Sequence, residues 1–135
     1  MTKLEWKYVS PLKEDTTIEI LELKYHFMIP DDLKECIIKN NAGVPSLSAF
    51  DFGENNAMVF GGLLSFNEGE SDSFFDYVSI FEKEDGKSLK MFPFALDPAV
   101  NFFCVENGKI VLYKHEEDRT IVICDTFSDF LNMLY

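Results

Sequence analysis

Apolar residues recur at helical spacing near the start of the chain. Ile18, Leu21 and Tyr25 line one face of a helix that this pattern predicts over residues 16–27. The pattern breaks at Pro30, which lacks the backbone N–H that a helix interior needs. The sequence therefore predicts one amphipathic helix, followed by a break.

A second, shorter helix is expected directly after this break. Asp31 can cap its start, and residues 40–43, which end in glycine, can stop it. Three apolar residues share one face of this helix: Leu33, Cys36 and Ile37. Neither helical stripe is wide enough to form a core alone, so both helices need another layer to cover them.

The middle of the chain mixes strand and helix signals. The pattern indicates a strand over residues 57–66, in which Gly61 and Gly62 suggest a bulge or bend. A polar turn over residues 67–72 follows, and apolar residues then return at helical spacing. We therefore expect a third helix over about residues 73–84.

The last third of the chain changes to short, β-rich segments. Asn107-Gly108 lies between two of them and is a strong signal for a hairpin. Thr126, with Asp129 three residues later, is typical of a capping box that opens a final helix. Four consecutive strands are predicted, over residues 89–96, 101–106, 109–115 and 120–125. An antiparallel meander is the natural arrangement of these strands.

Length and composition indicate a single globular domain over residues 1–135. The chain is 47% hydrophobic and contains 14 phenylalanines, enough for a core without disulfides or a structural metal. Three widely spaced cysteines suit buried thiols in a reducing compartment, so we expect a cytoplasmic protein. The first residues hold no signal-peptide core, and no apolar run approaches the roughly 20 residues of a membrane span.

The net charge of the chain limits the classes of partner that it can bind. The formal net charge of −12 would repel a phosphate backbone, which argues against direct nucleic-acid binding. No lysine or arginine lies between Lys39 and Lys83, so the acidic residues of this stretch have no compensating cation. We predict that six of them contribute to a partner-binding surface: Asp51, Glu54, Glu68, Glu70, Asp72 and Asp76. The three on the polar turn are expected to contribute little to folding stability.

The residues do not assemble a recognisable reactive site. Neither His26 nor His115 lies beside a nucleophile motif, and the acidic residues after His115 are consecutive, unlike metal ligands gathered from separate elements. The acidic turn begins like a calcium loop but has Ser73 in place of the required glycine. We therefore predict no catalytic residue, no metal and no cofactor, and a protein that is not an enzyme.

Several stretches, in order, resemble the SUKH superfamily, which includes fungal cell-wall-assembly regulators and many bacterial immunity proteins. Residues 29–34 followed by Asn41-Ala42-Gly43 resemble the family's second helix and its Asn-Gly-Gly stop. Residues 92–98 resemble its central Phe-Ala-x-Asp-Pro turn, and residues 125–131 its closing helix. Two departures stand out: Ala42 replaces the usual first glycine of the stop, and Ala99-Val100 replaces a frequent Gly-Gly.

The resemblance implies an α+β domain with a central antiparallel sheet of about four to six strands and helices packed against it. It also implies an immunity protein that neutralises a polymorphic or contact-delivered bacterial toxin, such as a nuclease, by stoichiometric binding. An acidic chain is complementary in charge to a basic toxin. We expect this chain to be a monomer or a weak homodimer. A regulatory protein-binding scaffold is the alternative, and a small hydrolase or sugar-binding protein is a third possibility.

Overall fold

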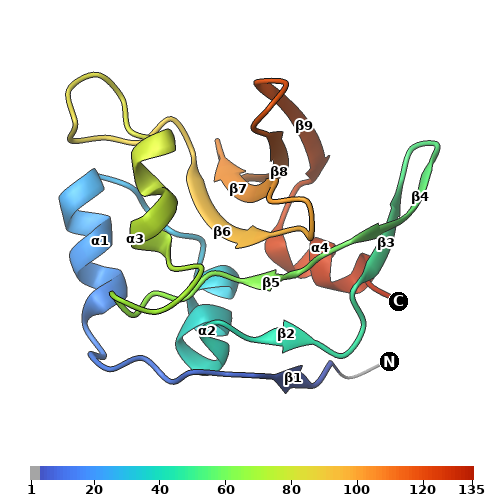
Figure 1. The fold of residues 1–135 in the computed structure, drawn as a ribbon, viewed down its shortest axis with the longest axis horizontal. Coiled ribbons are helices and arrows are strands. Elements are labelled where there is room, and N and C mark those ends of the chain that lie inside the picture. The colour runs from blue at the N-terminus through green and yellow to red at the C-terminus, as the bar shows by residue number, and fades with distance from the viewer. Residues whose placement is uncertain (1–3) are drawn as a thin grey trace.

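The two predicted helices of the first half are confirmed. A computed structural model describes residues 4–135 (Figure 1). Helix α1 spans Thr17–Tyr25 and helix α2 spans Asp31–Asn40, and each buries the apolar face that its spacing predicts. The N-cap of α2 is Pro30, whose carbonyl accepts the first helical hydrogen bond, from Lys34. The expected cap by Asp31 is therefore wrong, and Asp31 is the first helical residue.

The C-terminal half forms the predicted antiparallel meander. A five-stranded sheet has the order β5-β6-β7-β8-β9, with every neighbouring pair antiparallel. Asn107 and Gly108 both take positive φ, as a tight hairpin turn requires. The strands are β5 (Gly62–Leu63), β6 (Phe92–Leu96), β7 (Phe102–Glu106), β8 (Lys109–Lys114) and β9 (Arg119–Cys124).

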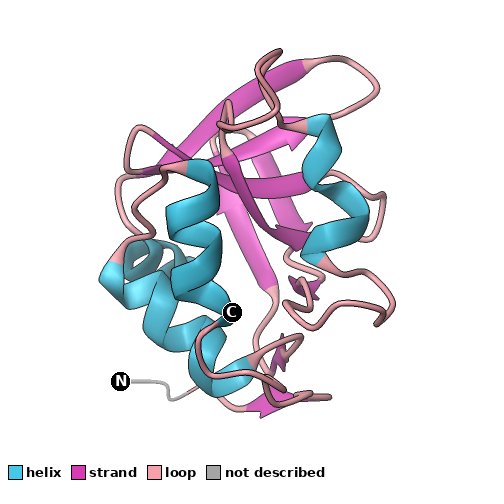
Figure 2. Ribbon diagram, turned by 90° about the vertical axis from the view of Figure 1, so that its left-hand side faces the viewer, coloured by secondary structure: helices cyan, strands magenta, loops and turns pink. Residues whose placement is uncertain are grey.

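Phenylalanines cover both faces of this sheet. Phe102 of β7 meets Tyr77 and Phe81 on one face. The next residue, Phe103, points to the other face and contacts Phe130 of helix α4 (Phe127–Met133). Figure 2 accordingly shows strands lying between helices on two sides. The protein has an α+β fold, as predicted.

The third helix is shorter than predicted. Helix α3 spans only Phe74–Tyr77 and passes into a 3₁₀ turn, η1 (Val78–Ile80). The carbonyl of Phe81 accepts a hydrogen bond from the Lys90 amide, so the chain turns back toward the sheet instead of continuing the helix. Apolar spacing alone could not reveal this competing partner.

The predicted strand over residues 57–66 is split at its two glycines. Its first part, β4 (Asn55–Val59), forms a hairpin with β3 (Ala49–Phe52), and its second part is β5. A third, two-stranded sheet pairs β1 (Trp6–Lys7) with β2 (Val44–Pro45). The sequence did not predict β1, β2 or β3, which are two to four residues long. Within residues 4–135, no helix has the length and apolar character of a membrane span.

Candidate functional site

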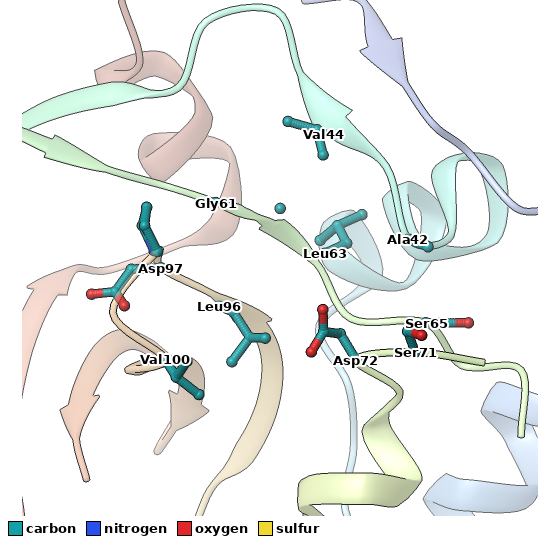
Figure 3. A pocket seen from close by; sticks show the side chains of 12 residues that line it. Ala42, Val44, Gly61, Leu63, Ser65, Ser71, Asp72, Leu96, Asp97 and Val100 are labelled. Atoms are coloured by element: carbon teal, nitrogen blue, oxygen red, sulfur yellow. The ribbon is translucent and has the colours of Figure 1, made fainter. Parts of the chain in front are cut away.

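An open cleft of about 470 Å³ lies where β2, β5 and the β6–β7 turn meet (Figure 3). Its apolar walls consist of Ala42, Val44, Leu63, Leu96, Pro98 and Val100. Its polar side chains are Ser65, Ser71, Asp72 and Asp97. No lysine, arginine or histidine lines the cleft in the described part of the chain, so carboxylates supply all of its charge.

Gly61 and Gly62 allow the backbone to form the floor of the cleft. The Gly61 amide donates to the carbonyl of Leu96 at 2.8 Å, and a Cβ on Gly61 would lie 2.7 Å from that same oxygen. Gly62 has φ +140°, and a Cβ there would lie 3.0 Å from Cγ2 of Val44. Only glycine therefore permits this approach between β5 and its neighbours.

The Asp97-Pro98 turn forms one wall and is fixed from within. Oδ1 of Asp97 accepts hydrogen bonds from the amides of Ala99 and Asn101, at 2.9 and 2.8 Å. Its Oδ2 accepts from Nδ2 of Asn101 at 3.0 Å. The carboxylate of Asp97 therefore serves mainly to hold the turn. The carboxylate of Asp72 accepts fewer side-chain hydrogen bonds than that of Asp97 and is the more available of the two for a ligand.

Two residues that line the cleft have backbone conformations that favour glycine. Ala42 has φ +64° and Val100 has φ +61°. A β-branched residue in this region is an outlier, and such strain clusters at functional sites. In the superfamily that the sequence resembles, glycine is frequent at both of these positions. The chain thus keeps a glycine-type backbone while presenting a methyl and an isopropyl group to the cleft.

A hydrogen-bonded polar cluster supports the cleft from behind. Asn41 is fully buried: its Oδ1 accepts from the amide of Phe66 at 2.7 Å, and its Nδ2 donates to the carbonyl of Ser10 at 2.8 Å. Ser65 Oγ accepts from Asn41 Nδ2 at 3.3 Å and donates to Glu70 Oε1 at 2.6 Å. The cluster ties the N-terminal segment and the end of α2 to the strand that forms the cleft floor.

Glu70 belongs to this cluster and not to a free surface. Besides the bond from Ser65, its carboxylate accepts from Oγ of Ser10 at 2.9 Å and from Nδ2 of Asn67 at 3.3 Å. Hydrogen bonds from Ser65 and then from Ser10 lower the pKa of Glu70. Removal of Glu70 would leave two hydroxyls and an amide without their acceptor. Contrary to the expectation from the sequence, Glu70 therefore contributes to folding stability.

The six predicted acidic residues fall into two separate groups. Asp51 and Glu54 lie on the β3–β4 hairpin, which projects on the opposite side of the molecule from α3 in Figure 1. The other four lie in residues 67–76, which comprise the turn before α3 and the first residues of α3 and which we call the acidic loop: Glu68, Glu70, Asp72 and Asp76. The acidic loop borders the cleft through Asp72, whereas the hairpin does not line it.

Most of these carboxylates also have an intramolecular partner. Asp51 accepts from the hydroxyl of Tyr135, and Asp72 accepts from the hydroxyl of Tyr77 at 2.8 Å. The Asp72 bond raises the pKa of Tyr77 to about 12. Asp76 completes a capping box with Ser73 at the start of α3. Within residues 4–135, Glu54 and Glu68 form neither a side-chain hydrogen bond nor an ion pair.

The residue types most associated with catalysis are not arranged for it in the described part of the chain. Burial raises the pKa of Cys36 to about 11 and raises that of Cys104 well above its ordinary value, so both thiols are protonated at neutral pH. Cys124 has a pKa of about 11, also raised by burial. No group of three or more histidine, cysteine, aspartate or glutamate residues within 4–135 could hold a metal ion.

Comparison with known families agrees with the fold. Residues 14–133 match the SMI1 / KNR4 family (SUKH-1), and the chain therefore belongs to this family. The family consists of immunity and regulatory proteins and is not known for enzymes. No curated protein and no solved structure matches the chain. The resemblance noted in the sequence is thus confirmed at the level of the family.

Proposed function

We propose that this protein is an immunity protein that binds a basic bacterial toxin, a nuclease, and neutralises it by forming a stoichiometric complex. The observation that carries the proposal is the cleft, where apolar walls meet an acidic loop in a stretch of chain without any lysine or arginine. A nuclease needs a basic groove for its substrate, and an acidic partner can be steered onto that groove and cover it.

The chemistry of the cleft suits the side chain of a lysine or arginine from the partner. Leu63 and Leu96 offer apolar contact to the aliphatic stem of such a side chain, and Asp72 lies where its charged end can reach. Glu68 of the acidic loop extends the negative field beyond the cleft. The strained Ala42 and Val100 narrow the cleft with apolar groups, which supports a role in contact and not only in folding.

The proposal places the protein in the cytoplasm, where thiols remain reduced. All three cysteines are free, with Cys36 and Cys104 buried. Binding needs no catalytic group on the immunity protein, so protection should scale with the amount of complex. The alternative within the same family is a regulatory scaffold that binds a different protein partner.

Co-expression with the toxic C-terminal domain encoded beside this chain tests the proposal. Cells should grow when both are made and die when the toxin domain is made alone. In vitro, residual nuclease activity should fall linearly with added protein and reach its minimum at about one molecule per toxin. Inhibition at a small fraction of that ratio would indicate an enzyme. No protection and no binding would favour the regulatory scaffold.

A further inference from the structure

Helix α1 has a second apolar face that points away from the core. Ile18, Leu21 and Tyr25 are buried, whereas the side chains of Ile20 and Leu23 are 56% and 77% exposed. Figure 1 places α1 at the outer edge of the fold, so nothing in residues 4–135 covers this face. Exposed apolar side chains that are adjacent on one helix mark an interaction surface more often than isolated ones do.

The spacing of this outer face is that of a helix seam. Within α1, Ile20 and Leu23 lie three residues apart, which is the spacing of two consecutive seam positions in paired helices. Phe27 lies beyond the left-handed C-cap His26 and stacks on Phe92, so it belongs to the core side. Met28, 89% exposed, extends the apolar surface beyond the end of α1. The two exposed residues Ile20 and Leu23 are called the outer seam.

Two charged residues flank the outer seam on opposite sides. Glu19 precedes Ile20 and Lys24 follows Leu23, and neither forms an ion pair within residues 4–135. Lys24 only lies over the ring of Tyr25, 5.2 Å from its centroid. Neighbouring Glu22, by contrast, is already paired with Lys34 at 2.9 Å.

These flanking charges select one partner and one orientation. Consider two such helices that pack in parallel about a two-fold axis. The residue just before a seam position on one helix then faces the residue on the other helix whose number is five higher. Glu19 of one copy then faces Lys24 of the second copy, twice by symmetry. In an antiparallel pair, each flank would face the same flank of the second copy, which brings Lys24 toward Lys24.

We propose that the outer seam is the interface of a symmetric homodimer in which two α1 helices pack in parallel. Ile20 and Leu23 of the two copies meet at the centre, and the Glu19–Lys24 pairs close both sides. Two helical turns bury less than the roughly 1,000 Å² typical of stable interfaces, so the dimer is weak and concentration-dependent. The proposal is independent of the toxin-binding function and uses a surface distinct from the cleft.

Sedimentation equilibrium of the purified protein tests the apolar part of this interface. The wild type should show a monomer–dimer equilibrium, and Leu23→Glu should weaken it at least about 30-fold, as expected for loss of a central contact. Val122→Glu is the matched control, because Val122 is 48% exposed on β9 and lies outside the seam. A wild type that stays monomeric at every concentration, or equal effects of both variants, would overturn the proposal.

A charge exchange tests the parallel orientation. Glu19→Lys or Lys24→Glu alone should weaken the dimer about tenfold by placing like charges together, and the double variant should restore it. In addition, Leu23→Cys should form an intermolecular disulfide on mild oxidation, beyond any formed by the wild type with its three native cysteines. A double variant that remains as weak as the single ones excludes the parallel dimer.

Discussion

Replacement of Asn41 by alanine should strongly destabilise the protein. The side chain is fully buried and forms hydrogen bonds with three groups: the Phe66 amide, the Ser10 carbonyl and the Ser65 hydroxyl. Alanine removes an acceptor and a donor together and supplies no substitute. The buried amide of Phe66 would then lack a partner, because its bond to Asn41 Oδ1 is the one it has.

The magnitude follows from the groups left without partners. A buried polar group that loses its partner costs about 1–3 kcal/mol, and an ordinary lost hydrogen bond about 1 kcal/mol. One stranded amide and two weakened acceptors therefore amount to about 3–4 kcal/mol in the free energy of unfolding. For a domain of this size, that corresponds to a melting temperature lower by about 10 °C.

The neighbouring Asn40 provides a matched control for this prediction. Its amide makes a single 3.8 Å contact to the sulfur of Cys36, and the residue is half-buried. Asn40→Ala should cost less than about 1 kcal/mol. Urea unfolding of both variants, followed by circular dichroism, gives the two free energies directly. If Asn41→Ala is no more destabilising than Asn40→Ala, the polar cluster does not hold the cleft as described.

Three further changes have defined outcomes. Val100→Gly should raise the free energy of unfolding by about 1 kcal/mol, because glycine adopts φ +61° without strain, and it should weaken toxin binding. Ala99→Gly is the control: Ala99 does not have a positive φ, so this change should not stabilise the protein. Because its pKa is lowered from 4.5, Glu70 contributes stability that is present above about pH 4.5 and is lost as the pH falls through the folded-state pKa. Unfolding from pH 7 to 3 should therefore show a shallower acid loss for Glu70→Gln. The double variant His26→Ala/His115→Ala should protect cells from the toxin as well as the wild type, as measured by growth on co-expression.

The sheet was predictable because its signals are local. The short β-rich segments and the Asn107-Gly108 turn each depend on neighbours in sequence, and the strands β6 to β9 follow them. The closing helix was predictable for the same reason: Oγ of Thr126 accepts a hydrogen bond from the Asp129 amide, as the capping pattern indicates. Family resemblance added the expectation that helices pack against a central antiparallel sheet.

The cleft was not predictable from local patterns, because distant residues create it. In sequence, Gly61-Gly62 suggests a bulge or bend, but the atom that requires Gly61 is the carbonyl of Leu96, 35 positions away. Glu70 looked like part of a solvated turn, yet it accepts a bond from Ser10, which is separated from it by 60 residues. Partners at such distances leave no periodic signal in a single sequence.

The association rate with the toxin at two salt concentrations tests the central claim most directly. Glu68→Lys/Asp72→Lys reverses charge beside the cleft and leaves Glu70 in its structural cluster, whereas Glu84→Lys/Glu116→Lys makes the same net change elsewhere on the exposed surface. The first variant should associate at least about tenfold more slowly than the second at low salt, with the difference shrinking at high salt as screening removes the steering. Equal rates for two folded variants at low salt would contradict binding through the cleft and its acidic loop.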